Sequence, residues 1–325
     1  MTILEIMKLW TLTTMLKAIN SIKLVSMYTY NKYFEGKEEP VYGNLAKLKI
    51  KKGAGLVLES IAPGADRLVD DLDDIYEITI EVPRFGKDAE LLAHEINQFE
   101  TLEGKNKAAA VSTWFKNKMK EHVADYSTTI EFMAAGALFG KVVDGKGKVL
   151  FEFKTTDEPV EFKDKDIDTV LEEIDDKLVE QLGMEVPYEV LCSSVFMKRL
   201  RAKAKAENLF EAKTAKDVDE DGKRVLLVHG KKFIPYRNSY KNTQGDTKKF
   251  IEDGKAVVIP NSEEVYKVVV ARADHTEAIK TVPTKFFASA PEKLPKGKGW
   301  GFSTESKVLP YCVKPEALIK LNFAA

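Results

Sequence analysis

The sequence GWGFSTESKVLPYCVKPEALIKLNF occupies residues 299–323 and closes with an apolar side chain at every second position. A period of two predicts a β-strand that is buried chiefly on one face. The apolar face would consist of Ala317, Ile319, Leu321 and Phe323, and the intervening positions are Leu318, Lys320 and Asn322. The pattern by itself also fits any edge strand at a C-terminus.

The strongest periodic segment lies far upstream of this strand, between Lys107 and Gly140. In this segment, mostly apolar residues recur every three or four positions. The mean step is about 3.6 residues, which is the period of a straight α-helix. A helix of about 33 residues would be about 50 Å long, well beyond the usual three or four turns. We therefore expect an element that acts as a beam. Its stripe consists of Ala108, Val111, Phe115, Met119, His122, Tyr126, Ile130, Met133 and Ala137.

The region between these segments mixes helical and strand patterns, which predicts an α+β protein. A helix is expected over residues 166–182, with Gly183 as its C-cap, and another should begin at a Ser193 or Ser194 cap. Residues 291–299 are predicted to be a linker. Strands are predicted at 141–143, 149–153, 186–192, 225–228, 233–236, 256–259 and 266–270.

Two amphipathic patterns lie near the N-terminus. The first predicts a helix within residues 1–24, whose apolar face needs cover from its own domain or from another copy of the chain. That face consists of Leu9, Leu12, Leu16 and Ile19. The second pattern predicts a thin, two-faced ribbon that cannot form a core alone. One side of the ribbon carries Leu45, Leu48 and Ile50, and the other carries Lys47, Lys49 and Lys51.

Composition limits the possible functions. The 325 residues suggest two lobes or one elongated molecule. A formal net charge of −1 argues against a dedicated reader of nucleic-acid sequence, which would carry a basic domain or stripe. Cys192 and Cys312 are far apart and form no redox or zinc motif. Charges interrupt the apolar N-terminus, so neither a membrane span nor a signal peptide is expected.

No segment offers a complete catalytic or metal site. His94 and Glu95 begin a zinc-protease pattern, but Gln98 stands where the second histidine should be. GKVVDGKG, at 140–147, lacks the magnesium-binding hydroxyl of a phosphate loop and is interpreted as a hairpin turn. The basic run 198–205 is interpreted as a solvated helix face. Four aspartates within residues 70–74 lack the spacing of a calcium loop.

In this order of elements, residues 299–323 resemble the closing segment of the major capsid protein E family of tailed bacteriophages, the lambda-like major head proteins. In that family a buried run, here Val308–Val313, precedes a Pro-centred turn, here Lys314–Ala317, and a final strand. Residues 107–153 resemble the spine helix and strand pair of Hong Kong 97-type shell subunits. Weaker resemblance covers residues 56–68 and 248–260, whereas the N-terminal helix and residues 213–222 have no clear counterpart.

The resemblance implies an HK97-like phage capsid fold of class α+β. The implied regions are an N-terminal arm at 1–35, an extended loop at 36–85, a peripheral domain with the spine helix at 86–165, an axial domain at 166–290 and closing strands of the peripheral domain at 291–325. The resemblance also implies contacts between subunits on the arm and on the extended loop. The candidate contact residues are Leu9, Leu12, Leu16, Ile19, Leu56, Leu58 and Ile61.

The implied function is that of a major capsid protein, which self-assembles into the icosahedral head shell enclosing the DNA genome. Its implied partners are copies of itself in hexamers and pentamers, a scaffolding protein, a portal, a decoration protein and packaged double-stranded DNA contacted without sequence preference. No membrane partner, enzyme activity, metal or cofactor is expected. The implied location is the virion, after assembly in the host cytoplasm.

Three other classes remain open at this point. An encapsulin-like cellular compartment shares the fold and would hold enzyme cargo in place of DNA. A tail or decoration protein would form tubes, rings or trimers and would not need the long helix. A hydrolase or other enzyme would need a convergent polar pocket, which the sequence does not reveal.

Overall fold

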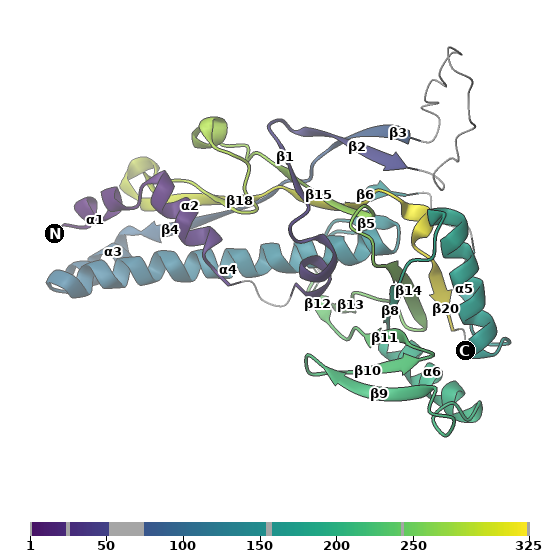
Figure 1. The fold of residues 1–325 in the computed structure, drawn as a ribbon. Helices are drawn as coiled ribbons and strands as arrows, with labels where there is room; N and C mark the ends of the chain where they lie inside the picture. Colours follow the sequence, from purple (N-terminus) through teal and green to yellow (C-terminus); the bar gives the residue numbers. More distant parts are fainter. Residues whose placement is uncertain (1, 24–26, 52–74, 154–157, 242–243, 324–325) are drawn as a thin grey trace, which may run out of the picture. The chain divides into compact units, whose positions relative to one another are not determined.

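The computed structural model describes residues 2–23, 27–51, 75–153, 158–241 and 244–323 (Figure 1). The chain contains both helices and strands, and most of the described strand pairs are antiparallel, as expected for the α+β class. The chain forms two compact units, each built from separated stretches of sequence. Unit 1 comprises residues 1–46, 80–131 and 268–310, and unit 2 comprises residues 47–79, 132–267 and 311–325.

Unit 1 contains the N-terminal helices, a small antiparallel sheet and most of the long helix α4. In this sheet β18 lies between β16 and β17 along one path and also pairs with β4. Its elements are α1 (Ile3–Leu9), α2 (Leu12–Asn20), the π-helix η1 (Tyr30–Phe34), β1 (Glu38–Val41), β4 (Phe85–Leu92), α3 (Ala93–Glu100), η3 (Thr276–Lys280), β16 (Phe287–Ala288), β17 (Glu292–Lys293), η4 (Pro295–Gly297) and β18 (Gly299–Ser306).

The helix α4 (Gly104–Leu138) confirms the predicted beam and is unbroken along its length (Figure 1). Its 35 residues correspond to about 52 Å at 1.5 Å per residue. Apart from Ala108, which is half-buried, every position of the predicted stripe is buried. In unit 1 the stripe packs on β18, where the rings of Phe115 and Phe302 lie 5.3 Å apart.

The N-terminal region forms two short helices, which corrects the prediction of one continuous helix. The hydroxyl of Thr11 accepts a hydrogen bond from the backbone N–H of Thr14 at 3.3 Å and so caps the start of α2. The break before Thr11 changes which side chains are buried. Trp10 stacks on Phe115 with ring centroids 4.8 Å apart, and Met15 is fully buried.

Unit 2 is built on a seven-stranded mixed sheet in the order β7-β20-β14-β8-β11-β10-β9. The pairs β8–β11 and β7–β20 are parallel, and the remaining pairs are antiparallel. Its elements are β5 (Lys141–Val143), β6 (Val149–Glu152), β7 (Val160–Glu161), α5 (Ile167–Leu182), β8 (Tyr188–Cys192), α6 (Ser194–Ala206), β9 (Ala215–Glu220), β10 (Lys223–Val228), β11 (Lys231–Pro235), β12 (Ser239–Lys241), β13 (Thr247–Lys249), β14 (Lys255–Pro260), η5 (Pro315–Ala317) and β20 (Lys320–Asn322).

The core of unit 2 lies where α5 and α6 pack against this sheet. It includes the apolar stripe of α5, which consists of Ile167, Val170, Leu171, Ile174, Leu178 and Leu182. Asp166 caps the start of α5 by accepting from the N–H of Thr169 at 2.7 Å. Gly183 ends the helix in the left-handed region with φ of 75°, as predicted from its C-cap position. Ser193 is the N-cap of α6.

Four strands and α4 extend past the limits of a single unit. These strands are β2 (Leu45–Lys51), β3 (Ile75–Glu81), β15 (Tyr266–Ala271) and β19 (Val308–Cys312).

The structure corrects two of the sequence predictions, one on the burial of Leu45 and one on residues 291–299. Leu45 is 63% exposed, because it shares the register of Lys47, whereas Leu48 and Ile50 are buried as expected. Residues 291–299 are more than a linker, because β17 within them pairs with β18.

The closing segment follows the predicted order of buried run, turn and strand. β19 is buried at every position, the turn is the short helix η5, and β20 pairs with β14 and β7. Ala317, Ile319 and Leu321 belong to the core of unit 2. The hairpin predicted at 140–147 is also confirmed, since Asp144 accepts hydrogen bonds from the N–H groups of Lys146 and Lys148 between β5 and β6.

Candidate functional site

The four candidate contact residues of the N-terminal region have different exposures. Leu9 is 59% exposed, Leu12 and Leu16 are half-buried, and Ile19 is fully buried in its own subunit. These exposures differ because the first helix ends before Thr11. The second helix, α2, therefore buries Met15 and Ile19 together. Leu9 therefore provides the most accessible apolar surface of this set. The contact role of all four residues stays a prediction.

The other candidate contact residues, Leu56, Leu58 and Ile61, lie outside the described residues, as do the four aspartates at 70–74. The described chain exposes large apolar side chains elsewhere. The set is Leu4, Leu9, Tyr42, Leu45, Leu102, Val149, Val179, Met184, Ile279 and Val282.

A buried carboxylate on α4 holds the segment that precedes β1. Glu131 is 1% exposed and accepts hydrogen bonds from the backbone N–H groups of Thr29 at 2.8 Å and Tyr30 at 2.9 Å. These amides lie at the start of η1, so the carboxylate satisfies donors that the helix leaves unpaired. We call this arrangement the Glu131 clasp. Sequence reasoning missed it, because the partners are about a hundred positions apart.

A second polar group continues from the clasp through Tyr30. The Tyr30 hydroxyl donates to Glu38 at 3.0 Å, and the Lys285 ammonium lies 2.7 Å from the same carboxylate. Burial and then the charge of Glu38 raise the pKa of Tyr30, so it stays a protonated donor. Burial opposes ionisation of Glu38, but the hydrogen bond and charge of Lys285 lower its pKa overall. The group therefore ties η1, β1 and the segment before β16 together.

His122, on the stripe of α4, is a packed side chain. Its Nδ1 lies 2.8 Å from the Thr304 hydroxyl, and the Tyr126 hydroxyl donates to the Thr304 carbonyl at 2.9 Å. Burial and then the charge of Lys87 lower the pKa of His122. Burial raises the pKa of Tyr126 to about 12. Nearby, Arg84 pairs with the buried Glu305 at 2.6 Å.

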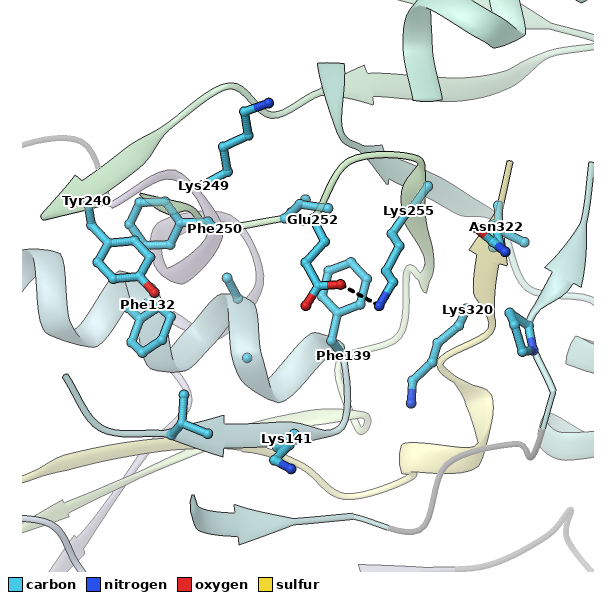
Figure 2. Close-up of a pocket in the computed structure, with 17 residues that line it drawn as sticks. Phe132, Phe139, Lys141, Tyr240, Lys249, Phe250, Glu252, Lys255, Lys320 and Asn322 are labelled. Carbon is cyan, nitrogen blue, oxygen red and sulfur yellow. Dashed lines mark ion pairs between the residues drawn. The ribbon is translucent and has the colours of Figure 1, made fainter. Parts of the chain in front are cut away.

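A cavity of about 500 Å³ lies in unit 2 (Figure 2). One end is aromatic. The ring of Phe132, from the last turns of α4, lies 4.5 Å from the ring of Tyr240 and 6.1 Å from that of Phe250. In Figure 2, Phe139 lies between this aromatic end and the side chains of Lys255 and Lys320. The cavity is thus apolar on one side and charged on the other.

Among the described residues, the cavity lining carries more lysines than carboxylates. These lining residues include Lys141, Lys249, Lys255, Lys320 and one glutamate, Glu252. Lys255 pairs with Glu252 at 2.6 Å, while Lys249 and Lys141 pair with carboxylates behind the lining. Burial and then the charge of Lys255 lower the pKa of Lys320. Desolvation and mutual repulsion therefore both favour an incoming anion.

The basic run on α6 behaves as a helix face with local ion pairs. Arg201 pairs with Asp217 at 3.0 Å, and Lys203 pairs with Glu207 at 3.7 Å. Both cysteines are buried, and neither forms a disulfide. In the part of the chain that the structure describes, no three metal-binding side chains come together, and no helix has the length and apolar character needed to cross a bilayer.

The family comparison and the structural comparison both find phage capsid proteins. A family model described as phage major capsid protein E matches residues 11–323. A putative capsid protein of a prophage of E. coli CFT073 is similar in structure, with a TM-score of 0.64, 13% identity, and coverage of 97% of this chain and 99% of that chain. No curated protein matches the sequence.

Two further solved structures are similar to this chain. The holo-SrpI encapsulin complex from Synechococcus elongatus PCC 7942 matches with a TM-score of 0.50 and 8% identity, over 92% of this chain and 87% of that chain. The mature capsid of bacteriophage PhiM1 matches with a TM-score of 0.48 and 12% identity, over 94% of this chain and 90% of that chain.

Proposed function

Because this chain belongs to the phage major capsid protein E family, we propose that its exposed edges bind further copies of itself in hexamers and pentamers. It has an HK97-like fold and is a shell protein of the tailed-phage head, and hence a structural component of the virion. The observation that carries this conclusion is the family match over nearly the whole chain. We expect the protein to perform no chemistry of its own.

The named regions of such a subunit are assigned here as a proposal. Residues 1–35 would be the arm, 36–85 the extended loop, 86–165 and 291–325 the peripheral domain, and 166–290 the axial domain. The two compact units divide the chain at other positions. A scaffolding protein, a portal, a decoration protein and packaged DNA are the partners we propose, with assembly in the host cytoplasm.

Many weak contacts, repeated over a closed lattice, would give the shell its strength. We propose Leu9 as a contact because its side chain is apolar, exposed and held on a docked helix. Complete burial of a leucine side chain contributes about 1.5–3 kcal/mol, so each copy of this contact would add only a modest binding free energy. Leu56, Leu58 and Ile61 are proposed as contacts on the extended loop.

Electron microscopy of the purified protein tests the function directly. Wild-type chain expressed with its scaffold should form closed shells, and Leu9→Glu should reduce their yield without lowering the melting temperature. Thr13→Glu, an exposed substitution on α2, is the matched control and should assemble normally. Shells of normal yield from Leu9→Glu would remove Leu9 from the contact set.

Deletion of residues 1–24 is a harsher form of the same test, and we expect it to block shell closure. It also removes Trp10, Met15 and Ile19 from the core of unit 1. A folded subunit is therefore confirmed by circular dichroism before the result is interpreted. Normal heads from a folded deletion variant would contradict a role for the arm.

The alternative with a specific observation behind it is an encapsulin-like compartment, since an encapsulin is among the similar structures. The contents of particles isolated from the native source separate the two. Double-stranded DNA inside the particles supports the phage head, whereas an enzyme cargo without DNA would support the compartment.

A further inference from the structure

The cavity of unit 2 has the chemistry of a receptor for a short acidic segment with a large apolar side chain. Its aromatic end, with Phe132, Tyr240 and Phe250, offers ring faces and edges to an apolar group. Lys255 and Lys320 line the other end (Figure 2). A ligand that carries a carboxylate directly beside an apolar side chain would satisfy both ends at once.

The chain presents such a segment at the end of α5, also in unit 2. Gly183 breaks the helix in the left-handed conformation, and the next residue, Met184, is 64% exposed. Glu180 and Glu185 flank Met184 and are exposed, and no ion pair involves either of them among the described residues. We call residues 179–185 the acidic knob. None of the residues that line the cavity comes from α5.

We propose that the acidic knob of one copy docks into the cavity of the next copy, with Met184 against the aromatic end and Glu185 beside Lys320 and Lys255. This inference rests on the proposed function, because it names one contact by which copies of the chain join. Knob and cavity are different surfaces of one unit. The contact is therefore heterologous and generates rings when the rotation between copies closes.

Three physical features favour this occupant. A thioether is polarisable and packs well against aromatic ring edges. The lysines of the described cavity lining are opposite in charge to the two glutamates of the knob. The pKa of Lys320 is lowered in the isolated subunit, so a docked carboxylate would stabilise its charged form. The contact should accordingly weaken as salt concentration rises.

A charge swap in the full-length chain tests the contact. Lys320→Glu and Glu185→Lys, made singly, should each weaken self-association about tenfold or more in sedimentation velocity at low salt, which corresponds to about 1.4 kcal/mol. The double variant places the opposite charges at the same contact and should restore association to within about threefold of wild type. Lys198→Glu and Glu263→Lys, on exposed positions of unit 2, serve as controls.

Circular dichroism and melting temperature establish that each variant is folded. Single variants that associate like wild type would overturn the proposal, as would a double variant whose defect equals the sum of the single defects. If Lys320→Glu associates normally but binds double-stranded DNA about tenfold more weakly, the cavity is a nucleic-acid site and the proposal fails. If the wild-type chain forms shells, any of these outcomes contradicts only the proposed contact and not the proposed function. If the wild-type chain forms no shells, the proposed function is contradicted.

Discussion

Replacement of Glu131 by alanine should destabilise unit 1 and release the segment around Tyr30. The carboxylate is buried and accepts two backbone hydrogen bonds, at 2.8 and 2.9 Å. Its removal leaves the N–H groups of Thr29 and Tyr30 without this acceptor. Each buried donor left unsatisfied costs about 1–3 kcal/mol, so the two together predict a loss of about 2–6 kcal/mol.

Hydrogen exchange and urea unfolding measure the two parts of this prediction. The amides of residues 29 and 30 should exchange faster in Glu131→Ala, and the midpoint of the urea transition should fall. Glu131→Gln keeps one acceptor oxygen and should lose less stability than the alanine variant. The matched control is Glu121→Ala on the same helix, where only the exposed pair with Lys118 at 2.9 Å is lost, for a cost of about 0.5 kcal/mol.

The comparison between the two helix positions decides the result. If Glu131→Ala and Glu121→Ala reduce the free energy of unfolding equally, the clasp contributes nothing beyond a surface charge. Unchanged exchange at residues 29 and 30 would contradict the argument as well. In that case the segment before β1 would be held by its buried aromatic rings alone.

The other predictions concern a close approach and a titration. A Cβ atom at Gly136 would lie 2.6 Å from the carbonyl oxygen of Lys141, so Gly136→Ala should cost about 1–3 kcal/mol in urea unfolding. Gly43→Ala, where nothing lies within 4 Å, should change stability by less than about 0.5 kcal/mol; equal losses at the two positions would refute the steric argument. Burial lowers the pKa of His122 in the folded protein. The neutral ring therefore contributes its full stability above pH 6.5, the usual pKa of histidine. This contribution is lost as the pH falls from 6.5 through the pKa of the folded state. His122→Gln should flatten this dependence between about pH 7 and pH 5 in thermal melts, and an unchanged slope would assign it to other groups.

The long helix, the caps of α5 and α6 and the closing segment could be predicted because their signals are local. The stripe on α4 follows from a period of 3.6, and Asp166 and Gly183 mark the ends of α5 by residue type alone. Two local errors have equally local causes. Thr11 has a side chain that is favoured at the N-cap, and it divides the predicted helix in two. In the strand at 45–51, side chains alternate between the two faces, so Leu45 lies on the same face as the lysines.

The clasp and the cavity could not be predicted, because no local pattern marks them. Glu131 is an ordinary glutamate in the sequence of α4 until the fold brings the N–H groups of Thr29 and Tyr30 to it. The cavity gathers side chains from α4, the β12–β13 hairpin, β14 and β20. Long-range contacts of this kind depend on the whole topology, which the resemblance to a known family implied but residue spacing did not.

The place of the last strands sets the moment at which a subunit becomes complete. β20 lies inside the seven-stranded sheet between β7 and β14, and β18 pairs along eight positions with β4. Neither sheet reaches its final form before residues 299–322 have left the ribosome. A nascent chain that stops before β18 should therefore lack finished units and be unable to join its neighbours, so synthesis itself would act as a check on which molecules enter the lattice.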